Sequence, residues 1–146
     1  MATERVTRTA PGWEERTLIL TPPADHAGDG TGAAHALRPG FQRLAVLLEV
    51  TAFGGGSGLS VYLQHSPDGV RWLDAAAFNL VTGAETQVLW LEAQPAVTGA
   101  AYAATADPVG PGMPHPGFLF RRLRVRWSTG GGTHTFGVDV VAIYPA

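Results

Sequence analysis

The sequence contains no cysteine, so a disulfide framework and a thiolate metal site are both excluded. It also contains no lysine: all ten basic residues are arginine, and the formal net charge is −2. General affinity for nucleic acid needs a strongly positive surface, and this charge balance argues against it. No apolar run approaches the roughly 20 residues that span a bilayer, and the N-terminus lacks the apolar core of a secretory leader. We therefore expect a soluble protein made in the cytoplasm, with neither nucleic acid nor membrane as a partner.

The common catalytic signatures are missing as well. The sequence has no GxSxG, HExxH or Walker pattern, and its twelve acidic residues are scattered without a distinctive pair. Asp25, His26 and Asp29 carry metal-ligand side chains at short spacing, but the spacing matches no loop that demands those ligands. A solvated loop is the preferred interpretation of these three residues. We expect no catalytic residues, no metal and no cofactor, and therefore no enzyme.

The stretch LSVYLQHSPDGVRWLDAAAF, residues 59–78, predicts a β-hairpin. Its first half alternates apolar and polar residues, which is typical of a strand with one buried face. The turn lies at four residues that favour a reversal of the chain: Ser66, Pro67, Asp68 and Gly69. Proline presets the backbone of the first corner, aspartate accepts hydrogen bonds from nearby N–H groups, and glycine adopts a positive φ.

The register of this hairpin follows from counting back from the turn. The count places Leu73 and Ala75 opposite Leu63 and Val61 on the core face. It places Trp72 on the other face, where the preferred interpretation is that its ring packs under a neighbouring strand or loop.

A second alternating stretch lies near the C-terminus. Arginine alternates with apolar residues over 122–128, three glycines follow, and residues 133–140 alternate again, which predicts a second hairpin with Arg122 opposite Asp139. The inward residues are Leu123, Val125, Trp127, Phe136, Val138 and Val140. The outward arginines are Arg122, Arg124 and Arg126. A solvated or edge-guarding face is the preferred interpretation of these arginines, and a protein interface and a polyanion site are the alternatives.

Shorter stretches complete an all-β prediction. Strands are predicted at residues 16–20, stopped by Pro22 and Pro23, and at 41–52 and 86–91, with connections rich in glycine and proline at 21–40, 54–58 and 92–117. A short strand is considered at residues 100–105. Residues 1–15 show no period and predict an extended arm, in which Trp13 either folds back onto its own domain or anchors into a neighbouring subunit. With residues 16–146 as a single domain, we predict an antiparallel β-sandwich of jelly-roll type with about eight strands.

The hairpin SPDGVRW, preceded by LSVYLQH and followed by LDAAAF, resembles a recurrent hairpin in virion proteins of tailed bacteriophages. The run from Phe41 and the closing GFLFRRLRVRWSTGGGTHTFGVDVVAIY fit the same pattern, so the resemblance covers about residues 41 to 144. It implies a non-enzymatic decoration (auxiliary or cement) protein, often trimeric, that binds the major capsid protein on the outside of the head. A minor tail protein is the alternative. Partner contacts in either role would come from Trp13, Arg122, Arg124 and Arg126.

The spacing of Ser66, Asp68, Gly69 and Trp72 is also similar to the hairpin of discoidin-like domains, which bind sugars or lipid headgroups. This second resemblance implies a carbohydrate-binding module in which Trp72 or Tyr62 stacks on sugar rings.

Overall fold

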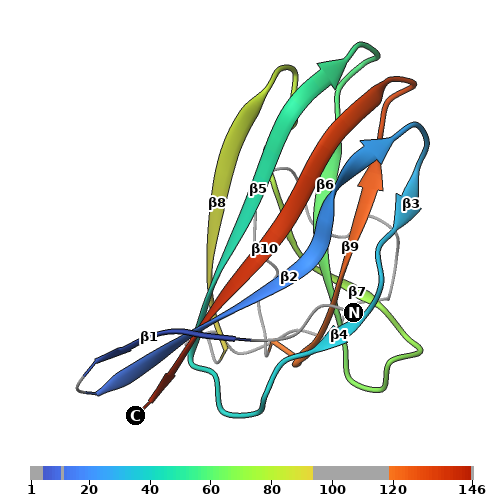
Figure 1. Cartoon of the computed structure of the whole chain (residues 1–146). Coiled ribbons are helices and arrows are strands. Elements are labelled where there is room, and N and C mark those ends of the chain that lie inside the picture. Colours follow the sequence, from blue (N-terminus) through green and yellow to red (C-terminus); the bar gives the residue numbers. More distant parts are fainter. Residues whose placement is uncertain (1–4, 11, 94–118, 146) are drawn as a thin grey trace.

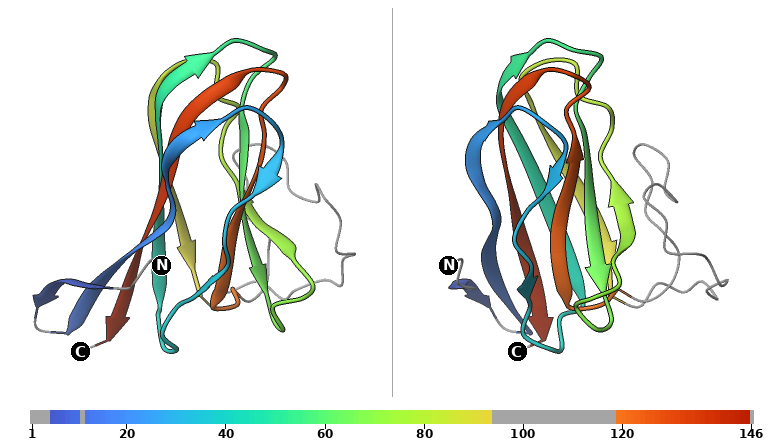
Figure 2. Two further views of the ribbon diagram at one scale, coloured as in Figure 1. Left: turned by 45° about the vertical axis from the view of Figure 1, so that its right-hand side comes forward. Right: turned by 90° about the vertical axis from the view of Figure 1, so that its right-hand side faces the viewer.

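A computed structural model describes residues 5–10, 12–93 and 119–145, and in that part of the chain all regular structure is β-strand. Its ten strands are β1 (Arg5–Ala10), β2 (Trp13–His26), β3 (Gly30–Thr31), β4 (His35–Ala36), β5 (Arg43–Gly54), β6 (Ser60–Ser66), β7 (Leu73–Ala77), β8 (Glu85–Glu92), β9 (Arg122–Ser128) and β10 (Thr133–Pro145). They form two antiparallel sheets that face each other (Figures 1 and 2). The all-β prediction is confirmed, with more strands than the sequence predicted.

The first sheet has the strand order β1-β2-β10-β5-β8, and the second has the order β3-β9-β6-β7 with β4 also paired to β9. The chain therefore crosses between sheets after β2, after β4, after β5, after β7, after β8 and after β9. The hairpin of β6 and β7 stays within the second sheet. The two layers are seen edge-on in the left-hand view of Figure 2.

The predicted C-terminal hairpin is wrong, because β9 and β10 lie in different sheets. Arg122 lies opposite Ser66 of β6, not opposite Asp139. Gly130 and Gly131, with φ of 62° and 88°, carry the chain across the sandwich. The glycine-rich connection between β5 and β6 makes the same kind of crossing, and the two connections touch: the Ser57 N–H donates to the Gly130 carbonyl at 3.0 Å. Neither connection is a hairpin tip.

The core lies between the two sheets and is made by alternate residues of the facing strands. The inward residues predicted for β9 and β10 are all buried, which confirms the period-two pattern there: Leu123, Val125, Trp127, Phe136, Val138 and Val140. In β5 the alternate residues Leu44, Val46, Leu48 and Val50 are buried as well. Because the inward side chains fill this core, the outward side chains of each sheet are the ones available for function.

The irregular arm predicted over residues 1–15 is instead a hairpin from Arg5 onward. β1 pairs with the beginning of β2, and Ala10 lies opposite Trp13. This hairpin projects from the body beside the end of β10 (Figure 1). β2 also continues through the predicted boundary at residue 16 without a break. The division of the chain into an arm and a domain stays a prediction.

β2 also continues through Pro22 and Pro23, where the sequence predicted its end. The register with β10 shifts between Phe136 and Val138, so a bulge in β2 sets the two prolines opposite the single residue Gly137. Proline has no N–H for the ladder and is tolerated at bulges. A Cβ at position 137 would lie 2.9–3.1 Å from atoms of Pro23, so only glycine leaves room for the ring. The predicted connection over 21–40 likewise contains β3 and β4.

We expect Gly137→Ala to lower the free energy of unfolding by about 1–3 kcal/mol, because the new methyl group overpacks against Pro23. Urea denaturation monitored by circular dichroism measures the difference. Gly83→Ala is the matched control, since a Cβ there meets nothing within 4 Å. Equal stability of the two variants would contradict this account of the bulge.

Candidate functional site

The connection between β6 and β7 is held by side-chain hydrogen bonds to its own backbone. Ser66 Oγ accepts from the Gly69 N–H at 2.7 Å. Asp68 Oδ1 accepts from the N–H groups of Val70 and Arg71 at 2.9 and 2.8 Å. The bonds from Arg71 and then Val70 lower the pKa of Asp68, because they stabilise its ionised form. Gly69 has a φ of 78°. These side chains are engaged in shaping the turn.

The predicted register of this hairpin is wrong. Leu63 lies opposite Ala76, because the connection takes up residues 67–72 and a bulge follows at Ala75. Trp72 lies in the connection, half-buried, and not in β7. The connection is longer than the predicted turn at residues 66–69, so every residue of β7 lies opposite a different residue of β6 from the one predicted.

The three arginines of β9 do point outward from the second sheet, but they take part in an ordered network. Arg126 contacts Asp74 through a hydrogen bond of 2.9 Å between Nη2 and Oδ2, and Asp74 is completely buried. Gln64 joins the network, since its Nε2 donates to Asp74 Oδ1 at 2.8 Å and its Oε1 accepts from Arg124 Nε at 2.8 Å. Arg122 donates to the Pro67 carbonyl at 2.9 Å.

Two aromatic rings complete this network. The guanidinium carbon of Arg126 lies 3.7 Å from the ring centroid of Tyr62, and that of Arg124 lies 4.4 Å from the centroid of Trp72. Burial, followed by the charge of Arg126, lowers the pKa of Arg124. The discoidin-like resemblance implied that Trp72 or Tyr62 stacks on sugar rings. One face of each of these two rings is covered by a guanidinium group, so that face is not free to stack on a sugar.

We expect Asp74→Ala to destabilise the fold by about 3 kcal/mol, because it leaves Arg126 without its partner at a partly buried site. A double-mutant cycle with Arg126→Ala, followed by urea denaturation, separates the pairwise energy from the loss of packing. The double variant should lose less stability than the sum of the two single variants. Strict additivity would show that the two side chains do not stabilise each other.

The outer face of the first sheet carries an apolar surface that sequence reasoning did not single out. Strand pairing places Thr17, Val141, Ala45 and Trp90 in one row across the sheet, and Ile19, Asp139, Leu47 and Val88 in the next. We call the set Ile19, Ala45, Leu47, Val88, Trp90, Val141 and Ile143 the apolar face. Trp90 is 75% exposed, Val88 43% and Ile19 40%. Its strands lie side by side at the front of Figure 1.

A signal for this surface is present in the sequence. Strands β5, β8 and β10 contain the runs LAVLL, VLWL and VVAI, in which residues of both parities are apolar. Such runs are typical of strands covered on both faces. In this fold one face of each strand lies in the core, and the other forms the apolar face.

The charged groups around the apolar face are of both signs. Glu15, Glu49 and Glu92 lie on the same side of their strands as the apolar face. Arg43 lies 4.0 Å from Glu92, and the positions of Arg5 and Arg8 in β1 lie opposite Thr17 and Glu15. Asp139 lies within the face, and burial, followed by the charge of Glu49, raises its pKa. Four carboxylates therefore accompany three arginine positions, which gives the apolar face a rim of mixed charge.

Trp13 lies at one end of this same sheet. It begins β2 opposite Pro145 and is 37% exposed. The structure thus separates the predicted contact residues, with Trp13 on the first sheet and the three arginines on the second.

We expect Asp139→Asn to stabilise the protein at pH 7 and to lose that advantage as the pH falls. The raised pKa means that the folded state binds a proton more tightly than the unfolded chain, whose aspartate titrates near about 3.9. The contribution of Asp139 to stability is therefore greatest below that pH and is lost as the pH rises through its folded pKa. Urea denaturation of both proteins between pH 4 and 7 measures it, and a difference that does not change with pH would contradict the prediction.

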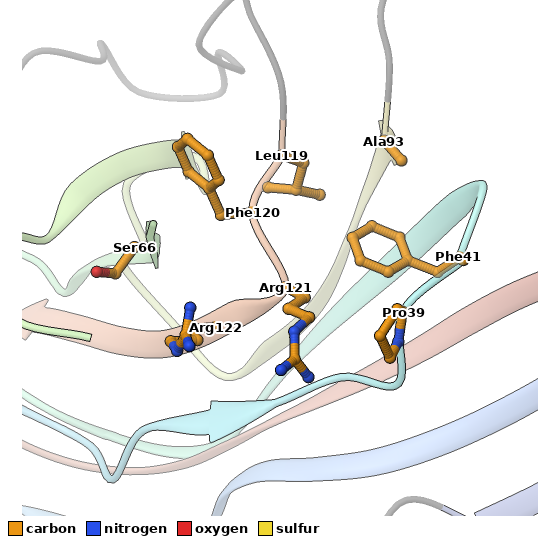
Figure 3. Close-up of a pocket in the computed structure, with 9 residues that line it drawn as sticks. Pro39, Phe41, Ser66, Ala93, Leu119, Phe120, Arg121 and Arg122 are labelled. Atoms are coloured by element: carbon orange, nitrogen blue, oxygen red, sulfur yellow. The ribbon is translucent and has the colours of Figure 1, made fainter. Parts of the chain in front are cut away.

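A cavity of about 410 Å³ lies at one end of the sandwich, with Phe41, Leu119 and Ser66 among its lining residues (Figure 3). Two arginines also line it, but Arg121 donates to the Leu37 carbonyl at 3.0 Å, and Arg122 is bound as described above. Ser66 Oγ is engaged in the turn, so the cavity presents no nucleophile with an adjacent base among the described residues.

The residues considered for a metal do not come together. Asp25 accepts from the Thr135 hydroxyl, and Asp29 accepts from the Thr129 N–H at 2.9 Å, while His26 packs against Trp127. Within residues 5–10, 12–93 and 119–145 there is no group of three histidine, cysteine or acidic side chains that could hold a metal ion. The same residues contain no helix with the length and apolarity of a membrane span.

Comparison with known proteins gives a likeness of fold. No protein-family model and no curated protein matches the chain. The solved structure of the SPBc2 prophage-derived protein YomS is similar, with a TM-score of 0.52 and 12% identity over 95% of this chain and 99% of that one. At that identity the likeness shows the fold alone.

A structure described as "CBM4 structure and function" has a TM-score of 0.38 and 15% identity, over 98% of this chain and 78% of that one. The structure of PirA gives 0.37 and 15%, over 97% and 100%. Both likenesses are too weak to support a conclusion.

Proposed function

We propose that this chain is a non-enzymatic structural protein of a phage or prophage particle, a jelly-roll subunit that decorates the outside of the head. A jelly roll has eight strands in two sheets, joined as two Greek keys. The orders β2-β10-β5-β8 and β3/β4-β9-β6-β7, with crossings at most connections, support that assignment. The fold likeness to a prophage-derived protein supports the proposed location in a phage or prophage particle. The resemblance of the hairpin at residues 59–78 to hairpins of phage virion proteins supports it as well.

The apolar face is the observation that carries the proposal. Soluble monomers rarely expose contiguous apolar patches of large area, and such patches mark binding sites for other proteins. Trp90, on the edge strand β8, is the kind of aromatic anchor that dominates protein interfaces. The first sheet is suited to docking through this surface, while the arginines of the second sheet are held in their own network.

The carboxylate of Asp139 within the apolar face favours a shell protein as its occupant. Two copies placed face to face would bring two such carboxylates into one apolar interface. A capsid surface with an apolar centre and a basic group opposite Asp139 is complementary. The trimer that the phage resemblance implies would form through another surface.

The location of the protein tests the proposal directly. Particles are purified from the phage or induced prophage whose genome encodes the chain, and their proteins are quantified by mass spectrometry. We expect the chain in stoichiometric ratio to the major capsid protein, and on heads separated from tails. Its absence from purified particles would refute the proposal, and its presence only in the tail fraction would replace decoration with a tail role.

We expect Val88→Glu to weaken binding to particles that lack the protein by at least tenfold, because it places a charge within the apolar face. Val70→Glu is the matched control, since Val70 is 80% exposed in the connection between β6 and β7. Co-sedimentation of each purified variant with the particles measures the binding. An equal loss of binding, or none, in both variants would contradict the assignment of this surface.

A further inference from the structure

The strand β8 ends the first sheet and pairs with β5 on one side only. On its other side no strand pairs with it within residues 5–10, 12–93 and 119–145, so β8 forms an open edge at the left of Figure 1. An open edge presents a row of backbone N–H and C=O groups on which another strand can pair. This edge is therefore a second possible contact surface, distinct from the outer side of the sheet.

The other edges of the two sheets carry features that prevent such pairing. β1 contains two arginines and a register shift. β3 and β4 have two residues each, and β7 has five residues and a register shift. Short strands, bulges, basic residues and proline are common protections of an edge. Between its two terminal glutamates β8 has none of these, and it pairs with β5 over eight residues without a register shift.

Hydrogen bonding determines which residues of β8 point toward the open edge. Just after β8, the Ala93 N–H donates to the carbonyl of Gln42, just before β5, at 2.9 Å. In an antiparallel ladder, residues that bond to the partner strand alternate with residues whose N–H and C=O groups point away from it. Positions 87, 89 and 91 therefore bond to β5. The remaining four turn their N–H and C=O groups to the open edge: Thr86, Val88, Trp90 and Glu92.

These four residues are complementary to a second copy of the same strand. A twofold axis beside Leu89 places Trp90 opposite the partner's Val88, and Glu92 opposite the partner's Thr86. All four residues then have a bonding partner within β8, and outward side chains lie beside outward side chains. A register displaced by two residues in either direction leaves one of the four without such a partner. A displacement by one residue would place outward side chains beside inward ones.

The side chains of this arrangement are also compatible with self-pairing. Glu92 lies opposite a threonine and Glu85 opposite an alanine, so no two carboxylates are directly opposite each other. An aromatic residue opposite a β-branched one, as with Trp90 and the partner's Val88, is a favourable cross-strand pair. Asp139 of β10 is separated from the edge by β5, so the two carboxylates that oppose a face-to-face pair stay apart.

We propose that β8 pairs with β8 of a second copy, so that two five-stranded sheets form one continuous sheet and their apolar faces join. The contact uses the edge of the sheet and leaves its outer side open, so it is independent of the docking role proposed above. It has twofold symmetry and therefore differs from the trimer that the phage resemblance implies.

Sedimentation velocity of the purified chain, over about a hundredfold range of concentration, tests the pairing. We expect a reversible equilibrium between monomer and dimer. A chain that stays monomeric at every concentration, or that forms trimers without dimers, would overturn the proposal. The experiment contains no shell protein, so its outcome does not depend on whether the docking role is correct.

Two substitutions of one residue separate the backbone contact from the side chain. Thr86→Pro removes an N–H that points to the open edge, and proline is tolerated at such positions of an edge strand. We expect it to weaken dimerisation by at least about tenfold, because a hydrogen bond is lost and the ring lies in the path of the partner strand. Thr86→Val keeps the N–H and should dimerise as the parent does. Equal dimerisation of the two variants would refute pairing through this edge.

Amide hydrogen exchange of the parent chain supplies a test without a substitution. The amides of Leu89 and Leu91 bond to β5 and are protected at any concentration, whereas those of Val88 and Trp90 are bonded only in the dimer. We expect exchange at Val88 and Trp90, measured by NMR, to slow as the concentration rises. A chain that dimerises without slower exchange at these two amides would have its contact elsewhere, which would refute the proposal.

Discussion

The structure depends on one constraint: every strand must bury alternate side chains between the two sheets. One buried core cluster contains residues of both sheets, among them Leu44, Val46 and Leu48 of β5 and Leu123, Val125 and Trp127 of β9. Burial of apolar side chains is the dominant favourable contribution to folding. Once one side of each strand is used in this way, the outer sides of the two sheets differ, and that difference underlies the functional interpretation.

The second sheet covers its outer side with polar groups that satisfy one another. Asp74 is fully buried beneath Arg126 and Gln64, and Tyr62 and Trp72 lie against guanidinium groups. The first sheet instead exposes Trp90 and Val88 beside Leu47. A sheet with such a surface gains stability when a partner covers it, because apolar area leaves water. This difference between the two outer sides is the physical basis for the proposal that the chain binds a partner protein. It is also the reason why we propose the first sheet as the binding surface.

The sequence was a good guide to burial and a poor guide to pairing. Period-two alternation identified the inward residues of β9 and β10, since that property depends on each strand alone. Alternation does not state which strand lies alongside, so Gly130–Gly132 was interpreted as a hairpin turn although it crosses between sheets. The path of β2 through Pro22 and Pro23 depended on a bulge at these prolines and on the room that Gly137 leaves for them in a strand distant in sequence.

The candidate site was predicted less completely than the fold. The turn residues Ser66, Asp68 and Gly69 were recognised because their hydrogen bonds are local. The outward direction of the arginines was also predicted, but their partner Asp74 depends on how β6 aligns β7 with β9. The apolar face was missed because its residues come from strands far apart in the chain and meet only after the sheet has formed.

Hydroxyl-radical footprinting of the particle-bound and the free protein measures most directly whether the apolar face is the docking surface. Mass spectrometry compares the oxidation rate of Trp90, which is highly exposed in the isolated chain, with that of Val70 in the connection between β6 and β7. This account predicts strong protection of Trp90 in the particle and little change at Val70. Equal oxidation of Trp90 in both states would contradict it and would place the contact elsewhere on the molecule.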